Sequence, residues 1–466
     1  MRRLSLVLAG LAFGGCAVGP NYQRPQLPVP AQFYGEQAAT EARTLADLPW
    51  WEVFDDPVLK GLIGEALKNG YDARLAAARV EEARARYGIA RSDLLPQAGY
   101  TAGWTRERQD QFFNPSGATD TKWTAKLGFS WELDLWGRIR RLSEAARARY
   151  LATEEARRGV LLSLASDVAI AYFELRELDA ELEIARRTTS AFQDTYDLFS
   201  RRLEGGAASA LETSRAEASL GQVAAQIPEL ERAIVARENE INLLLGRSPQ
   251  PIPRDVPLAR LPPAVPPGLP AALLERRPDV RQAEQELVAA NANIGVAKAA
   301  FFPTLSLTGL FGNVSPELGD LFSKGKTWSI AANLLGPLFT GGSVKRNLAA
   351  TRAQWEQAKI LYEAAVTNAL AEVSTALVSR AKLVETERQR ARTVAAYQEA
   401  VRLANLRYIS GLSAYFEVLE SQQQLFPAEI TLAQTRRNQL IAVVDLYRAL
   451  GGGWKAEALD QAAPRP

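Results

Sequence analysis

The sequence predicts a mainly α protein with a transmembrane β part, in which a helix–strand–strand–helix unit occurs twice. Two glycines, Gly206 and Gly246, recur 205 residues later as Gly411 and Gly451, which indicates an internal duplication. Long proline-free segments rich in Ala, Arg and Glu predict helices, and four shorter segments alternate apolar and polar residues as strands do. A chain of this kind is expected to assemble with copies of itself.

The helical segments of the two halves match in order and in length. They are 72–94, 138–203 and 208–245 in the first half, and 278–300, 341–409 and 413–450 in the second. At 1.5 Å per residue, 138–203 would be about 100 Å long, and its two shorter companions stacked end to end would total about 90 Å. A plain antiparallel coiled coil would also account for these helices, so the helices alone leave that alternative open.

The strand segments are expected at about 97–107, 122–134, 303–313 and 326–336. In the second of them one face carries only apolar residues: Trp123, Ala125, Leu127, Phe129, Trp131 and Leu133. Such alternation with aromatic residues on the apolar face is typical of transmembrane barrel strands. A soluble sheet with one buried face is the alternative, but the Ala-rich helices leave no evident core to cover that face.

Four strands are too few to close a barrel, and lipid does not tolerate open strand edges. Identical chains must therefore supply the missing strands. Two copies would give eight strands and three would give twelve, and geometry alone permits both.

The N-terminus indicates a signal peptide at residues 1–15, with Arg2 and Arg3 before a short apolar stretch. The only cysteine, Cys16, follows two glycines and is predicted to carry a lipid, although an ordinary signal with an incidental cysteine is the alternative. The expected domains are a lipidated segment at 16–57, repeats at 58–248 and 269–451, a Pro-rich linker at 249–268 and a tail at 452–466.

Several function classes lack support in the composition. There is no histidine, the commonest general base and metal ligand, and a net charge of +2 gives no reason to expect a nucleic-acid partner. We therefore expect no catalytic residue, no metal site and no cofactor apart from the covalent lipid. An enzyme is one rival interpretation; a non-conducting coiled-coil protein is the other, but it does not account for four alternating strands.

Four motifs carry a family resemblance: CAVGPNYQRP at Cys16–Pro25, WELDLWGR at Trp131–Arg138, LERRPDV at Leu274–Val280 and NANIGVAKAAFFP at Asn291–Pro303. They resemble outer membrane factors, the TolC-like efflux lipoproteins of the NodT/OprM type. The resemblance implies a homotrimer with a 12-stranded β-barrel in the outer membrane, continued by a 12-helix α-barrel in the periplasm. It also implies an efflux duct that works with a periplasmic adaptor (membrane fusion) protein and an inner-membrane pump of the resistance-nodulation-division (RND) type. Drug, metal and protein cargo all remain open, although the lack of His and of internal Met argues against a metal relay.

The resemblance also assigns the helix-hairpin turns. It implies that they form the periplasmic tips that contact the adaptor, and the residues concerned are Gly205, Gly206, Ala207, Gly411 and Leu412. The first tip lacks the usual Leu after its glycine and is the weaker match.

The resemblance also implies a gate at the periplasmic tip. The residues concerned are Glu212, Tyr408, Glu417 and Glu420. Glu417 and Glu420 share a helix face and would form acidic rings in a trimer, although an ordinary solvated first turn is the alternative. Glu212 and Tyr408 resemble a polar tether that keeps the tip closed, although simple packing of Tyr408 between neighbouring helices is the alternative. A second tether is in doubt because Ser413 stands where relatives carry a basic residue, and Arg402 or Arg407 could replace it.

Overall fold

The computed structural model describes residues 17–34, 54, 56–108, 112, 117–254, 270 and 273–452. The first half contains α2 (Pro57–Asn69), α3 (Tyr71–Ser92), β1 (Gln97–Arg108), β2 (Thr119–Leu133), α4 (Arg138–Glu204), α5 (Ala210–Ala224) and α6 (Gln226–Leu244). The second half contains α7 (Leu273–Arg276), α8 (Pro278–Ala299), β3 (Thr304–Ser315), the 3-10 turn η4 (Leu318–Asp320), β4 (Lys326–Leu335), α9 (Ser343–Ile409) and α10 (Phe416–Ala449). The predicted fold class, a duplicated helix–strand–strand–helix repeat, is confirmed. The signal peptide, Cys16, most of the Pro-rich linker and most of the C-terminal tail lie outside the described residues.

The chain divides into two compact units. Unit 1 comprises residues 1–27, 79–154 and 282–364, and so contains the four strands and the helical segments that adjoin them in sequence. Unit 2 comprises residues 28–78, 155–281 and 365–466 and contains the remaining helical segments.

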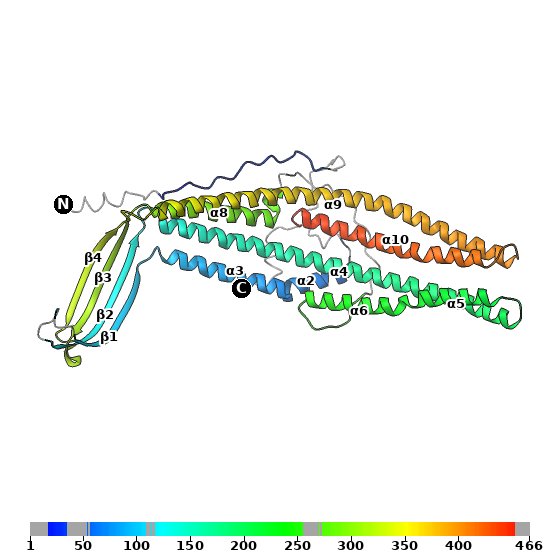
Figure 1. Ribbon diagram of the computed structural model, residues 1–466, viewed down its shortest axis with the longest axis horizontal. Coiled ribbons are helices and arrows are strands. Elements are labelled where there is room, and N and C mark those ends of the chain that lie inside the picture. The colour runs from blue at the N-terminus through cyan, green and yellow to red at the C-terminus, as the bar shows by residue number, and fades with distance from the viewer. Residues whose placement is uncertain are drawn as a thin grey trace. The chain divides into compact units, whose positions relative to one another are not determined.

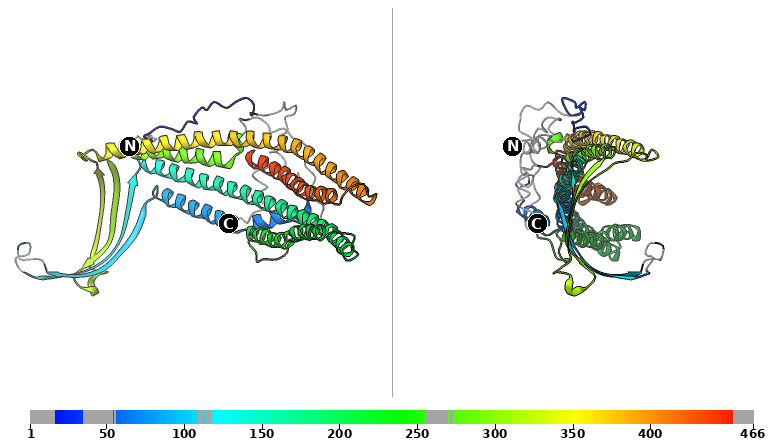
Figure 2. Two further views of the ribbon diagram at one scale, coloured as in Figure 1. Left: turned by 45° about the vertical axis from the view of Figure 1, so that its right-hand side comes forward. Right: turned by 90° about the vertical axis from the view of Figure 1, so that its left-hand side faces the viewer.

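In unit 1 the strands form one antiparallel sheet in the order β1-β2-β3-β4, and they lie side by side and curve together (Figures 1 and 2). The register aligns one row across all four strands: Tyr100, Leu127, Phe311 and Trp328. Opposed residues of an antiparallel pair share a face, and every second residue of a strand returns to it. The register therefore places the predicted apolar face of β2 on the same side of the sheet as Tyr100, Phe311 and Trp328.

This apolar face is open in the single chain. Tyr100 is 83 % exposed, Trp328 is 72 % exposed and Ile330 is 73 % exposed. Among the described residues, β1 and β4 are edge strands with a partner on one side only. An aromatic face and two free edges are both unfavourable in water, so the sheet is incomplete as one chain.

The helices of unit 1 approach one another closely because their contacting residues are small. Ala145 and Ala148 of α4 pack against Ala289 and Ala292 of α8, and none of the four is more than 3 % exposed. Alanines at a helix contact allow the backbones to come together. None of the helices that the structure describes is both long and apolar enough to cross a membrane.

In unit 2, α10 contacts both long helices. Gln434 of α10 donates to Glu181 of α4 (2.9 Å), and Arg390 of α9 donates to the carbonyl of Thr431 of α10 (3.1 Å). The single helix expected at 208–245 is two helices, α5 and α6, which meet at Ala225. Pro228 explains the break, because it has no N–H for the carbonyl four residues earlier.

Candidate functional site

The two helix hairpins of unit 2 turn through the same backbone motif. At the first turn Gly206 has φ +70°, and the N–H of Ala207 donates to the carbonyl of Arg202 (2.7 Å). At the second, Gly411 has φ +71°, and the N–H of Leu412 donates to the carbonyl of Arg407 (2.8 Å). These are Schellman caps, which require a left-handed residue. Because no atom lies within 4 Å of a Cβ added at either glycine, backbone conformation alone selects glycine here.

Both turns present apolar side chains to solvent. Leu412 is 70 % exposed and Ile409 is 79 % exposed beside the second turn, and Leu211 is 60 % exposed beside the first. Gly205 and Ala207 are exposed as well. Exposed apolar groups at a hairpin end are available for contact with another protein.

The predicted tether residues bond to other partners in this chain. Glu212 forms a capping box with Ser209: its Oε2 accepts from the Ser209 N–H (2.8 Å) and the Ser209 hydroxyl (3.0 Å). These hydrogen bonds hold the pKa of the Glu212 carboxyl below its usual value. The Tyr408 hydroxyl accepts from the guanidinium of Arg202. Within the described part of the chain, no hydrogen bond joins Glu212 to Tyr408.

Glu417 and Glu420 lie in the first two turns of α10 and are both exposed, whereas Val418 and Leu419 between them are buried. Arg407 forms an ion pair with Glu417 (3.5 Å), and Arg402 pairs with Glu399 on its own helix (2.6 Å). Of the two arginines considered for a second tether, Arg407 is therefore the one that already bonds across the second turn.

An aromatic cluster joins the two hairpins. The ring of Tyr415 lies 4.6 Å from the ring of Phe199 and 5.1 Å from the ring of Tyr408, and its hydroxyl bonds to the Thr195 hydroxyl (2.7 Å). Phe192 is buried in the same cluster. The position of Tyr408 is consequently fixed by packing as well as by Arg202.

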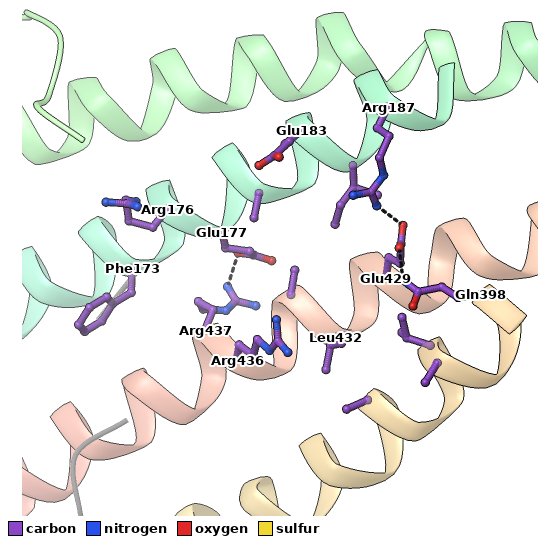
Figure 3. A pocket seen from close by; sticks show the side chains of 16 residues that line it. Phe173, Arg176, Glu177, Glu183, Arg187, Gln398, Glu429, Leu432, Arg436 and Arg437 are labelled. Atoms are coloured by element: carbon purple, nitrogen blue, oxygen red, sulfur yellow. Dashed lines mark hydrogen bonds and ion pairs between the residues drawn. The ribbon is translucent and has the colours of Figure 1, made fainter. Parts of the chain in front are cut away.

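Further along unit 2, α4, α9 and α10 enclose a groove of about 440 Å³ (Figure 3). At one end Arg437 pairs with Glu177 (3.2 Å). At the other, Arg187 donates to Glu429 (2.6 Å), which also accepts from Gln398 (3.1 Å). The groove is thus lined by charged side chains that link three helices.

Among the acidic residues that line this groove, Glu177 has the pKa that is shifted furthest from its usual value. Burial and the neighbouring Glu181 together raise the pKa of its carboxyl to about 7, against the opposing effect of Arg437. Sequence reasoning missed this group, because Glu and Arg recur throughout α4 and α10 and nothing in their spacing marks the buried ones. It also missed the hydrogen bond from Arg202 to Tyr408, although Arg202 and Arg407 stand at matching positions four residues before each turn glycine.

Among the described residues, no group of three or more His, Cys, Asp or Glu is placed to hold a metal ion. The predicted lipidation site, Cys16, lies outside the described residues, so the lipid remains a prediction. The features that stand out are therefore an open apolar sheet face in unit 1 and two capped hairpin tips in unit 2.

Comparison with known proteins decides the family. The sequence profile described as "Outer membrane efflux protein" matches residues 62–247 and again 269–452. The chain belongs to this family. Two relatives from Pseudomonas putida are each 37 % identical to this chain, over 97 % of this chain and 95 % of theirs. They are the antibiotic efflux pump outer membrane protein ArpC and the toluene efflux pump outer membrane protein TtgC. The crystal structure of the open state of the Neisseria gonorrhoeae MtrE outer membrane channel has a TM-score of 0.83 at 34 % identity, covering 94 % of this chain and 98 % of that one.

Membership of the outer membrane efflux protein family confirms the resemblance drawn from the four motifs. It also settles the choice between channel and enzyme, because the family consists of efflux channel proteins. The family profile matches twice, once in each half of the chain, as expected for a duplicated protein. The family is one of outer membrane proteins, which agrees with the predicted location.

Proposed function

We propose that this outer membrane efflux protein forms the exit duct of a tripartite efflux system. The observation that carries the proposal is the sheet of unit 1, which has one exposed aromatic face and two free edges. Lipid would cover the apolar face, and neighbouring copies would pair with β1 and β4. The opposite face, with Thr101 and Lys126 in register, would line the water-filled lumen.

The number of copies we propose is three, as the resemblance to TolC-like channels implies, which gives twelve strands. Exposed apolar residues on α3 and α9 support contacts between copies in the helical part. Ile89 of α3 is 67 % exposed, and Leu361 of α9 is 67 % exposed. Such residues would be buried where helices of adjacent chains meet.

Two matched substitutions on β4 test the assignment of the faces. Ile330→Arg places a charge on the apolar face, where Arg near the bilayer midplane costs about 2–4 kcal/mol per chain. Ser329→Arg places the same charge on the opposite face, one residue away. We expect Ile330→Arg to abolish membrane insertion, and Ser329→Arg to insert and conduct in planar bilayers with altered ion selectivity. Equal insertion of the two variants would contradict the proposal.

The hairpin tips are proposed as the docking surface for the periplasmic adaptor. Their support is the pair of Schellman caps and the exposed Leu412 beside the second. The gate is proposed at the same end, with Glu417 and Glu420 as acidic rings. The tether between Glu212 and Tyr408 would form in the assembled trimer, because in the single chain both residues bond elsewhere.

The tether has its own test. Glu212→Ala with Tyr408→Phe is expected to loosen the tip and raise single-channel conductance. Because Glu212→Ala also removes the capping box, Ser209→Ala is the control for the cap alone. If conductance of the double variant equals that of the control, the tether assignment fails.

The cargo is proposed to be small organic molecules, delivered through the adaptor by an inner-membrane pump of the RND type. The names of the relatives support this class, since they refer to antibiotic and toluene efflux. Cys16 is proposed to carry the lipid that anchors the N-terminus in the outer membrane. Mass spectrometry of the intact protein would detect that lipid.

A further inference from the structure

A basic pocket lies in unit 1. It has a volume of about 610 Å³, and its walls are the N-terminal segment Pro20–Pro25, α8 and α9. Four cationic side chains line it against one carboxylate, Glu356; they are Arg24, Lys298, Arg352 and Lys359. The pocket also contains the indole of Trp355.

The N-terminal segment is pinned in place by specific hydrogen bonds. The carbonyl of Pro20 accepts from Asn291 (2.9 Å), and the side chain of Asn21 accepts from Arg141 (2.8 Å). Tyr22 donates to Glu284 (3.1 Å). This wall of the pocket is therefore built into unit 1.

The close approach of the segment to α8 depends on a helical glycine. A Cβ added at Gly295 would lie 2.8 Å from the carbonyl oxygen of Val18 and 2.7 Å from the side chain of Arg141. Any larger residue would push the segment away from the helix. Gly295 thus allows the N-terminal segment to lie close against α8.

The four cationic side chains differ in whether they bond to a carboxylate. Arg24 forms two hydrogen bonds with the carboxylate of Glu284, and Lys359 lies 3.5 Å from Glu356. In the described part of the chain, neither Lys298 nor Arg352 takes part in an ion pair. Two positive charges therefore face the pocket without a compensating carboxylate.

The positions on α9 place the functional groups on one helix face. Trp355 follows Arg352 by three residues, and Lys359 follows Trp355 by four, which is the spacing of side chains that lie above one another. Lys298 is in the last turn of α8 and stands opposite this face, six residues before β3 begins at Thr304. The pocket is thus adjacent to the end of the sheet at which the helices join the strands.

We infer that this pocket binds the phosphate group of a glycerophospholipid, with Lys298 and Arg352 as the principal contacts. The inference rests on the proposed function, because a sheet that spans the outer membrane places the pocket beside the headgroups of one leaflet. Basic pockets at that depth bind anionic headgroups, and Trp favours the membrane interface. The alternative source of the same chemistry is free phosphate.

The test uses the purified full-length protein in detergent and native mass spectrometry with three ligands: phosphatidylglycerol, diacylglycerol and inorganic phosphate. Phosphatidylglycerol is expected to bind to the wild-type protein. Lys298→Gln with Arg352→Gln should weaken that binding about twenty-five-fold, since each charge near a headgroup contributes about a factor of five. The control is Arg388→Gln with Arg392→Gln, which removes the same charge from exposed positions further along α9. It should leave binding unchanged.

Several outcomes would overturn the inference. Diacylglycerol lacks the phosphate, so binding as tight as that of phosphatidylglycerol would show that the acyl chains alone are bound. Inorganic phosphate binding as tight as that of the lipid would assign the pocket to a free anion. If the double variant does not assemble, each single variant should bind about fivefold more weakly, and wild-type affinity in both would contradict the inference. A variant that no longer binds the lipid but still conducts ions would show that the lipid site is not required for channel function. A wild-type protein that forms no channel would refute the proposed function itself.

Discussion

Replacing Glu177 by Gln should stabilise the hairpins of unit 2 above neutral pH. The Glu177 side chain is 8 % exposed, and burial raises the pKa of its carboxyl from 4.5 to about 7. An acid whose pKa is higher in the folded state favours folding when protonated, so its contribution is complete below about pH 4.5 and is lost as the pH rises through about 7. At about 1.4 kcal/mol per pKa unit, ionisation of Glu177 costs the folded state up to about 3 kcal/mol at pH 8.

The variant keeps the size of the side chain and removes its charge. Arg437 retains an ion-pair partner in Glu174 (3.5 Å). The net gain in stability at pH 8 is therefore expected to be about 1–3 kcal/mol, and at pH 5 close to zero. Glu183 also lines the groove but is exposed, which makes Glu183→Gln a matched control on the same helix.

Hydrogen exchange of α10 amides around Arg437 measures the local opening free energy. It should be compared among wild type, Glu177→Gln and Glu183→Gln at pH 5 and at pH 8. Wild type and the control should lose protection between pH 5 and pH 8, after correction for intrinsic exchange, while Glu177→Gln should not. The same pH dependence in all three proteins would refute the reasoning.

Three further predictions concern the tip and the lumen. Leu412→Ser should weaken adaptor binding about tenfold to hundredfold, because burial of a Leu contributes about 1.5–3 kcal/mol. A binding assay with unchanged affinity would remove Leu412 from the docking surface. Glu417→Gln with Glu420→Gln should lower the preference for cations, seen as a shift of the reversal potential in a KCl gradient. Lys126→Gln, on the polar face of the sheet, should shift the same potential toward cations, whereas Lys326→Gln on the other face should not.

The elements that sequence reasoning predicted well are those with a local cause. The strand faces follow from a period of two, so the apolar face of each strand could be assigned before the register was known. The turns at Gly206 and Gly411 follow from a backbone conformation that glycine adopts readily. The lengths of α4 and α9 follow from long segments without proline.

The interactions that sequence reasoning did not predict depend on contacts between distant segments. Arg202 meets Tyr408, and Arg437 meets Glu177, only because separate helices pack together in unit 2. The capping box of Glu212 could have been predicted from the sequence, since a Ser followed three residues later by Glu is its signature.

The proposed duct requires identical chains to complete the membrane sheet that one chain carries. Its most direct test is the native mass of the purified protein in detergent. We predict a particle with three times the mass of one chain, which inserts into planar bilayers and conducts ions. A stable monomer that remains soluble without detergent would contradict this requirement.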